Sequence, residues 1–192
     1  VRCDNRGLDV RFLEDRLHAF LASCKTNQYI RFYTAEEAAR ESLHNPDHRI
    51  QLHILDFGTE ETRITETRET LRRDDVLIGR TQSRPPQDVF GTVKADVLTW
   101  EKSIATHGML DLRIVEVGTT RSLLHEKLPG ESVWRDSWAT YRGDERALPE
   151  HMKRTVEKKE CAAPSRQFLF EAVTEGLFTA ATEHIRTFYA RH

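Results

Sequence analysis

Apolar and polar residues alternate along the stretch from Arg49 to Thr59. Ile50, Leu52 and Ile54 are separated by polar residues, and further apolar bulk follows before the run ends. A repeat of two residues is typical of a β-strand that buries one face. We therefore expect a central strand at this point of the chain.

The rest of the chain divides into segments with a helical spacing and segments with a strand-like pattern. Apolar residues that recur every three or four positions predict helices over residues 9–24, 95–106 and 165–191. Acidic residues at its start predict a short helix over residues 36–43, and the highly charged residues 60–73, with only Ile64 and Leu71 as apolar anchors, predict an exposed helix. Alternating, β-branched or aromatic residues predict strands over residues 29–35, 49–59, 75–82, 110–118 and 133–141. Residues 150–160 are rich in charge and are typical of a solvated helix or a linker.

An alternation of strands and helices favours parallel strands joined by right-handed crossovers. The expected fold class is therefore α/β, with three layers and a mostly parallel sheet of four or five strands with flanking helices. A length of 192 residues suits a single domain that spans the whole chain. The long helix at residues 165–191 would pack on this domain or mediate assembly into a homo-oligomer.

The composition restricts the class of protein. The 29 basic and 31 acidic side chains are interspersed, so net charge does not point to nucleic acid, although a local basic patch would leave that partner open. No run approaches the roughly 20 apolar residues that cross a bilayer, and the first residues have no apolar signal-peptide core. We expect a cytoplasmic protein that makes no membrane contact.

Polar residues follow the predicted parallel strands, where helix N-termini offer free N–H groups to anions. The candidate ligand-binding residues at these strand ends are Asp56, Thr59, Arg80, Glu116, Thr119 and Arg121. Together they predict a site for a small phosphorylated or nucleotide-like ligand, although helix capping explains such residues equally well. The glycine-rich phosphate loops of dinucleotide and P-loop enzymes are absent from the sequence.

No motif specifies a metal or a cofactor. The three cysteines lack C-x-x-C spacing and the nine histidines lack an H-E-x-x-H pattern, so surface histidines and reduced thiols are expected. A nuclease-like metal site would need carboxylates such as Asp56, Asp74, Asp75 and Glu116 to converge. The Trp134, Trp138 and Tyr141 cluster, interleaved with arginines, would form core or stack on a planar ligand.

The segment Leu123–Leu128 reads L-L-H-E-K-L and contains an H-x-K pattern. It resembles the start of the signature of the phospholipase D superfamily. The resemblance implies that His125 is a catalytic nucleophile and that Lys127 holds phosphate. Ser132 stands where that family has an aspartate, and no Gly-Ser pair follows, so the resemblance is to degenerate members that act as regulatory or sensing domains.

These observations favour a non-catalytic ligand-sensing or interaction domain that binds a phosphorylated or nucleotide-like ligand at the C-terminal ends of the strands. The alternative is a phosphodiesterase or nuclease that uses His125 and Lys127 or a carboxylate–metal site. A third hypothesis is a structural module that assembles through its C-terminal helix.

Overall fold

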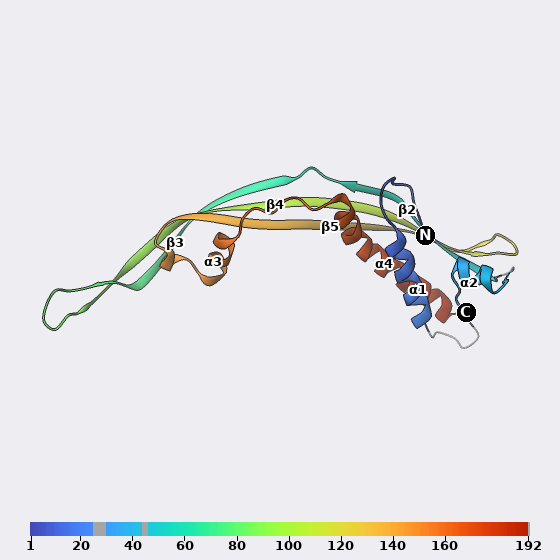
Figure 1. Cartoon of the computed structure of the whole chain (residues 1–192), viewed down its shortest axis with the longest axis horizontal. Helices are drawn as coiled ribbons and strands as arrows, with labels where there is room; N and C mark the ends of the chain where they lie inside the picture. Colours follow the sequence, from blue (N-terminus) through green and yellow to red (C-terminus); the bar gives the residue numbers. More distant parts are fainter. Residues whose placement is uncertain (25–29, 44–45, 192) are drawn as a thin grey trace. The chain divides into compact units, whose positions relative to one another are not determined.

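The computed structural model describes residues 1–24, 30–43 and 46–191. Five strands and several helices make up the described chain (Figure 1). The strands are β1 (Arg2–Cys3), β2 (His48–Thr59), β3 (Arg63–Arg80), β4 (Asp88–Glu116) and β5 (Ser122–Gly143). The helices are α1 (Arg11–Ser23), α2 (Ala35–Arg40), α3 (Glu150–Glu157) and α4 (Arg166–Ala190), with a short 3-10 turn η1 (Glu145–Ala147).

Internal contacts divide the chain into two compact units. Unit 1 comprises residues 1–60, 105–133 and 164–192, and unit 2 comprises residues 61–104 and 134–163. Strands β4 and β5 contribute residues to both units, so each unit is built from segments that are distant in sequence.

The five strands form one mixed sheet in the order β1-β2-β4-β3, and β5 also pairs with β4. β1 and β2 are parallel, whereas β4 pairs antiparallel with both β2 and β3. β4 and β5 are joined by residues 117–121, too few for the crossover of a parallel pair, so this pair is antiparallel as well. The predicted sheet with flanking helices is confirmed, but the mostly parallel sheet is wrong, and a three-layer arrangement stays a prediction.

The topology differs from the prediction because two expected helices are strands. Residues 60–73 were expected to be helical, but β3 runs from Arg63 to Arg80 and pairs with β4. Three threonines in its first half favour extended backbone, since β-branched side chains fit a pleated surface. Residues 95–106 lie within β4 and are also extended. Without these two helices no crossover connects the strands, so the chain returns through hairpins.

The remaining expectations divide between confirmed and wrong. The strand at 49–59 is β2, and the helices at 9–24, 36–43 and 165–191 are α1, α2 and α4. Val10 is the N-cap residue of α1, and the Asp9 carboxylate just before it accepts a hydrogen bond from the Arg11 backbone N–H. The strand expected over 29–35 is wrong for residues 30–35, while residue 29 lies outside the described chain.

In unit 1 the helices α1 and α4 lie side by side and cover one face of the strands (Figure 1). Phe12 of α1 meets Phe170 of α4 edge to face, and Phe170 also meets Phe57 of β2. The predicted apolar stripe of α4 is buried, as shown by Phe170, Val173, Leu177, Ala181, Ile185 and Phe188. None of the described helices is both long and apolar enough to span a membrane.

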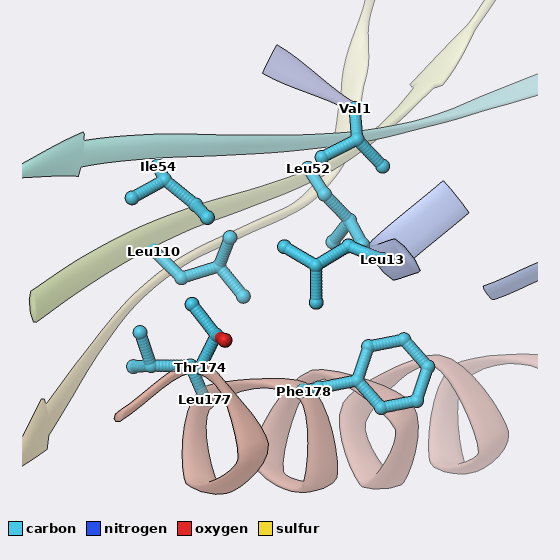
Figure 2. Close-up of a pocket in the computed structure, with 8 residues that line it drawn as sticks. All are labelled: Val1, Leu13, Leu52, Ile54, Leu110, Thr174, Leu177 and Phe178. Carbon is cyan, nitrogen blue, oxygen red and sulfur yellow. The ribbon is translucent and has the colours of Figure 1, made fainter. Parts of the chain in front are cut away.

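Figure 2 shows the junction between these helices and the strands. Leu52 and Ile54 of β2 and Leu110 of β4 point toward Leu13 of α1 and Leu177 of α4 around a cavity of about 10 Å³. A void of that size is at most one water molecule in volume, and its apolar lining would keep it dry. It is therefore a packing defect of the core and not a ligand pocket.

Unit 2 has a separate small core. Val93, Ala95 and Val97 of β4 pack with Ala139 of β5 and Leu148, and side chains of α3 close over them. Asp144 caps the turn η1 by accepting a hydrogen bond from the Arg146 backbone N–H. The Arg146 guanidinium also holds the pKa of Asp144 down to about 2, so this carboxylate stays charged through the neutral range. Gly143 adopts a φ of 121°, which a residue with a side chain rarely reaches.

Replacing Leu112 with alanine tests the unit 1 core. Leu112 is fully buried opposite Leu52, so we expect the free energy of unfolding to fall by about 2–5 kcal/mol in chemical denaturation. The matched control is Leu43→Ala, because Leu43 is exposed and should lose less than about 1 kcal/mol. Equal losses in the two variants would contradict the described core.

Candidate functional site

The strand-end residues that the sequence singled out do not form one site. In the β2–β4 pair, Asp56 lies opposite Met109, whereas Glu116 lies opposite His48 at the other end of the pair. Strands rise about 3.4 Å per residue, so the seven positions from Met109 to Glu116 span roughly 24 Å. The antiparallel sheet thus separates the two carboxylates that a parallel sheet would have brought to one edge.

Glu116, Thr119 and Arg121 do meet, at the turn between β4 and β5. The Thr119 hydroxyl donates to the Glu116 carboxylate, and the Arg121 backbone N–H donates to the Thr119 hydroxyl at 3.3 Å. The Glu116 N–H donates to the Arg121 carbonyl at 2.9 Å. These bonds close the turn, so the polar groups of this cluster are largely engaged with one another.

The other two candidates lie apart from this turn. Thr59 of β2 lies opposite Thr106 of β4 in unit 1. Arg80 lies in unit 2, where its Nε is 2.7 Å from a carboxylate oxygen of Asp88 on the neighbouring strand. Neither residue adds to a common ligand crevice with the turn residues.

His125 and Lys127 lie on β5 with one residue between them, so both side chains point to the same face of the sheet. A side chain at Gly130 would collide with Leu177 of α4, which places the even-numbered positions of this part of β5 toward the helices. The odd-numbered His125 and Lys127 therefore point away from α1 and α4. We call this side of the unit 1 strands the open face.

The centre of the open face is Asp111 of β4, whose side chain is only 3% exposed. One carboxylate oxygen is 2.6 Å from His125 Nε2, and the other accepts a hydrogen bond of 2.8 Å from Arg113 Nε. His125 and Arg113 keep 44% and 47% of their side chains exposed. A single buried carboxylate thus holds an imidazole and a guanidinium whose outer parts reach solvent.

The short contact to Asp111 indicates which ring nitrogen carries the hydrogen. A carboxylate that has lost its proton can only accept, so with Asp111 in that form His125 Nε2 is the donor. In the neutral ring Nδ1 is then the nitrogen with a free lone pair, and in the charged ring it is a second donor. The pair could therefore offer either a base or a donor to a molecule on the open face.

Two more histidines share this face. His53 of β2 lies directly opposite Asp111, and its Nε2 is 2.6 Å from a carboxylate oxygen of Asp4. The His107 ring lies over Gly58, and its Nε2 is 4.0 Å from an oxygen of Asp56. The face therefore gathers cationic and titratable groups from three adjacent strands.

The sequence reasoning missed Asp111 and Arg113 as site residues. The sequence predicts a strand over residues 110–118 but no hairpin between this strand and the next one. A hairpin over residues 110–125 would have placed an aspartate of the first strand beside the histidine of the second. The short connection between the two strands was therefore the signal that could have identified these residues.

The predicted carboxylate group and the predicted aromatic cluster differ from the expectation. No three His, Cys, Asp or Glu side chains are placed to hold a metal ion within the described ranges, which include Asp56, Asp74, Asp75 and Glu116. Trp138 stacks on Trp100 with ring centroids 6.1 Å apart. The aromatic cluster is thus built between neighbouring strands of unit 2 rather than along β5 alone.

Comparison with protein-family models finds no family that matches this chain, and the searches of curated proteins and of solved structures find no match either.

We predict that the neutral His125 ring carries its hydrogen on Nε2, because Asp111 accepts from that nitrogen. Imidazole 1H–15N correlation spectra at alkaline pH should show this tautomer, and Asp111→Ala should replace it with a mixture. As a matched control, Asp4→Ala should change the His53 signals and leave those of His125 in place. A wild-type ring with its hydrogen on Nδ1 would contradict the described geometry.

Proposed function

We propose that this chain is a non-catalytic ligand-sensing or interaction domain that binds a phosphorylated or nucleotide-like ligand on the open face of unit 1. The observation that supports the proposal is the arrangement of His125 and Arg113 around the buried Asp111, with Lys127 on the same face of β5 as His125. This location replaces the strand ends, since the register of β2 and β4 keeps Asp56 and Glu116 apart.

Charge supports an anionic ligand. Both oxygens of Asp111 are engaged with His125 and Arg113, so its negative charge is already compensated by these neighbours. The hydrogen bond to Arg113 uses Nε, which leaves the terminal N–H groups of the guanidinium for another acceptor. Guanidinium groups bind phosphate oxygens in a bidentate manner, and the exposed Lys127 ammonium adds a second positive charge.

The rigidity of the supports also favours binding. His125, Lys127 and Arg113 lie on paired strands rather than on loops, and the Asp111 carboxylate restricts the rotation of two of them. A site that is ordered before binding pays less conformational entropy when the ligand arrives. Arg113 and His125 are therefore ready to receive a phosphate group without a rearrangement of the sheet.

A phosphodiesterase is the second candidate, and the His125 tautomer is the observation that favours it. With Nε2 donating to Asp111, the Nδ1 lone pair is the one that could attack phosphorus, while Lys127 on the same face would hold the phosphate. At the position of the family's aspartate, the Ser132 carbonyl accepts a hydrogen bond of 3.0 Å from Thr106, and no carboxylate is present. An aspartate that the resemblance requires for hydrolysis is thus missing there, so we rank binding above hydrolysis.

A cytoplasmic location belongs to the same proposal, because phosphorylated small molecules and nucleotides are abundant there. The three cysteines of the sequence lack the spacing of a disulfide framework, which agrees with reduced thiols.

Calorimetric titration of the purified chain with pyrophosphate and with ATP tests the binding proposal. We expect Lys127→Glu to weaken binding by about tenfold or more, since it replaces a positive charge beside the phosphate with a negative one. The matched control is Lys159→Glu, which makes the same change at an exposed position of unit 2 and should leave affinity nearly unchanged. Absence of binding by the wild type, or equal weakening in both variants, would overturn the proposal.

The same preparations distinguish binding from hydrolysis. A generic phosphodiester is incubated with the wild type and with His125→Ala, with and without a divalent cation. Turnover that disappears in His125→Ala would establish the phosphodiesterase instead. Background turnover in both, together with the expected titrations, would support the non-catalytic domain.

A further inference from the structure

Unit 2 presents a second sheet face that its own helix does not cover. Val93, Ala95 and Val97 point into the core under α3, so the residues between them point the other way. Two cross-strand hydrogen bonds of 2.6 Å lie on this side, from Thr70 to Asp96 and from Thr92 to Asp74. We call this side the outer face of unit 2. Its residues on β4 are Phe90, Thr92, Lys94, Asp96, Leu98 and Trp100.

The outer face has two apolar ends and a charged middle. At one end Phe90 lies directly opposite Leu77, and their side chains are 60% and 41% exposed. At the other end Leu98 and Trp100 are half-buried, and Trp100 stacks on Trp138. Lys102 lies over the Trp138 ring and donates to the Cys161 carbonyl, so the chain itself covers part of this end. Solvated faces of antiparallel sheets are normally polar, and an exposed apolar cluster on a strand near a sheet edge marks a contact surface.

The order of side chains along β4 is self-complementary about Ala95. Lys94 and Asp96 flank Ala95, Thr92 and Leu98 come next, and Phe90 and Trp100 follow. Consider a two-fold axis that is perpendicular to β4 at Ala95 and lies between the outer faces of two copies. It would set the two faces against each other with their β4 strands running in opposite directions. Each lysine would then meet an aspartate, and each phenylalanine would meet a tryptophan.

The neighbouring strand carries one complementary charge pair under the same rotation, whereas Glu66, opposite Trp100, would meet Leu77, opposite Phe90. Arg68 of β3 lies opposite Leu98, while Asp74 is hydrogen-bonded to Thr92. The rotation that sets Leu98 on Thr92 of a second copy therefore also sets Arg68 against Asp74. Hydrogen bonds from Thr92 and Arg72 hold the pKa of Asp74 below its usual value, so this carboxylate is charged at neutral pH.

We propose that the outer face of unit 2 is a homodimer interface in which a second copy of this chain packs across a two-fold axis near Ala95. Closed two-fold contacts between identical surfaces are the commonest form of soluble oligomer. Charge complementarity on both strands would fix the register, and the apolar ends would supply the buried area.

Other occupants fit this face less well. A lipid surface would have to take up the carboxylates of Asp74 and Asp96 together with the apolar residues, at a high cost in desolvation. The C-terminal helix, the other candidate for assembly, buries Phe170, Leu177 and Ile185 against its own strands. An unrelated protein would not require the order of residues to be symmetric about Ala95.

Sedimentation of the full chain over a range of concentrations tests the interface. The wild type should approach twice the 22.3 kDa mass of one chain as concentration rises. Lys94→Glu and Asp96→Lys should each shift the dissociation constant by about tenfold or more toward the monomer, because both place like charges opposite one another. Lys159→Glu, the same charge reversal on an exposed site outside this face, should dimerise as the wild type does.

A mixture of the two single variants provides the decisive test. When the Lys94→Glu and Asp96→Lys chains are combined, every contact across the axis pairs opposite charges again, so the mixture should dimerise. The Lys94→Glu/Asp96→Lys double variant should dimerise alone for the same reason. Folding defects cannot imitate rescue in the mixture. A wild type that stays monomeric, single variants that dimerise normally, or a mixture that stays monomeric would overturn the proposal.

Discussion

Both units depend on the backbone hydrogen bonds that strand β4 forms with its neighbouring strands. β4 runs from Asp88 to Glu116 and has neighbours along both of its edges, β2 and β3 on one side and β5 on the other. Its backbone groups are satisfied only while these neighbours remain extended. Each unit therefore needs part of this strand, and each core takes side chains from it.

The two cores use different residues of β4, and this difference explains the main error of the sequence-based prediction. In unit 2 the buried positions are odd-numbered, such as Val97, whereas in unit 1 they are even-numbered, such as Ile104 and Leu110. The change from one set to the other spaces Val97, Trp100 and Ile104 by three and four residues. Such spacing is also the signature of a helix, so a strand whose buried positions change from odd to even numbers is read as helical.

Other elements were predictable because a single pattern runs through them. Residues 49–59 keep one buried face, and α4 keeps one apolar stripe from Phe170 to Phe188. β3 gave no such signal, because its side chains are almost all exposed and alternate between threonine and charge. Its extended state is set by pairing with β4, a tertiary contact that local propensity does not report.

The candidate site was predictable only in part, because it too depends on which strands pair with one another. The H-x-K pattern identified His125 and Lys127, but the partner that orients His125 lies on another strand. Asp111 and Arg113 become site residues through the β4–β5 hairpin, and Asp56 and Glu116 are separated by the β2–β4 register. Sheet order therefore decided which polar residues meet.

In the function that we propose, the groups held by Asp111 receive a phosphate on the open face of unit 1. The most direct measurement is an NMR titration of the labelled full chain with inorganic phosphate, followed through the arginine side-chain and histidine ring signals. We predict saturable shifts at the Arg113 guanidinium and the His125 ring, with the Arg135 signals of unit 2 unchanged. Shifts that are absent at Arg113 and His125, or equally large at Arg135, would contradict the claim.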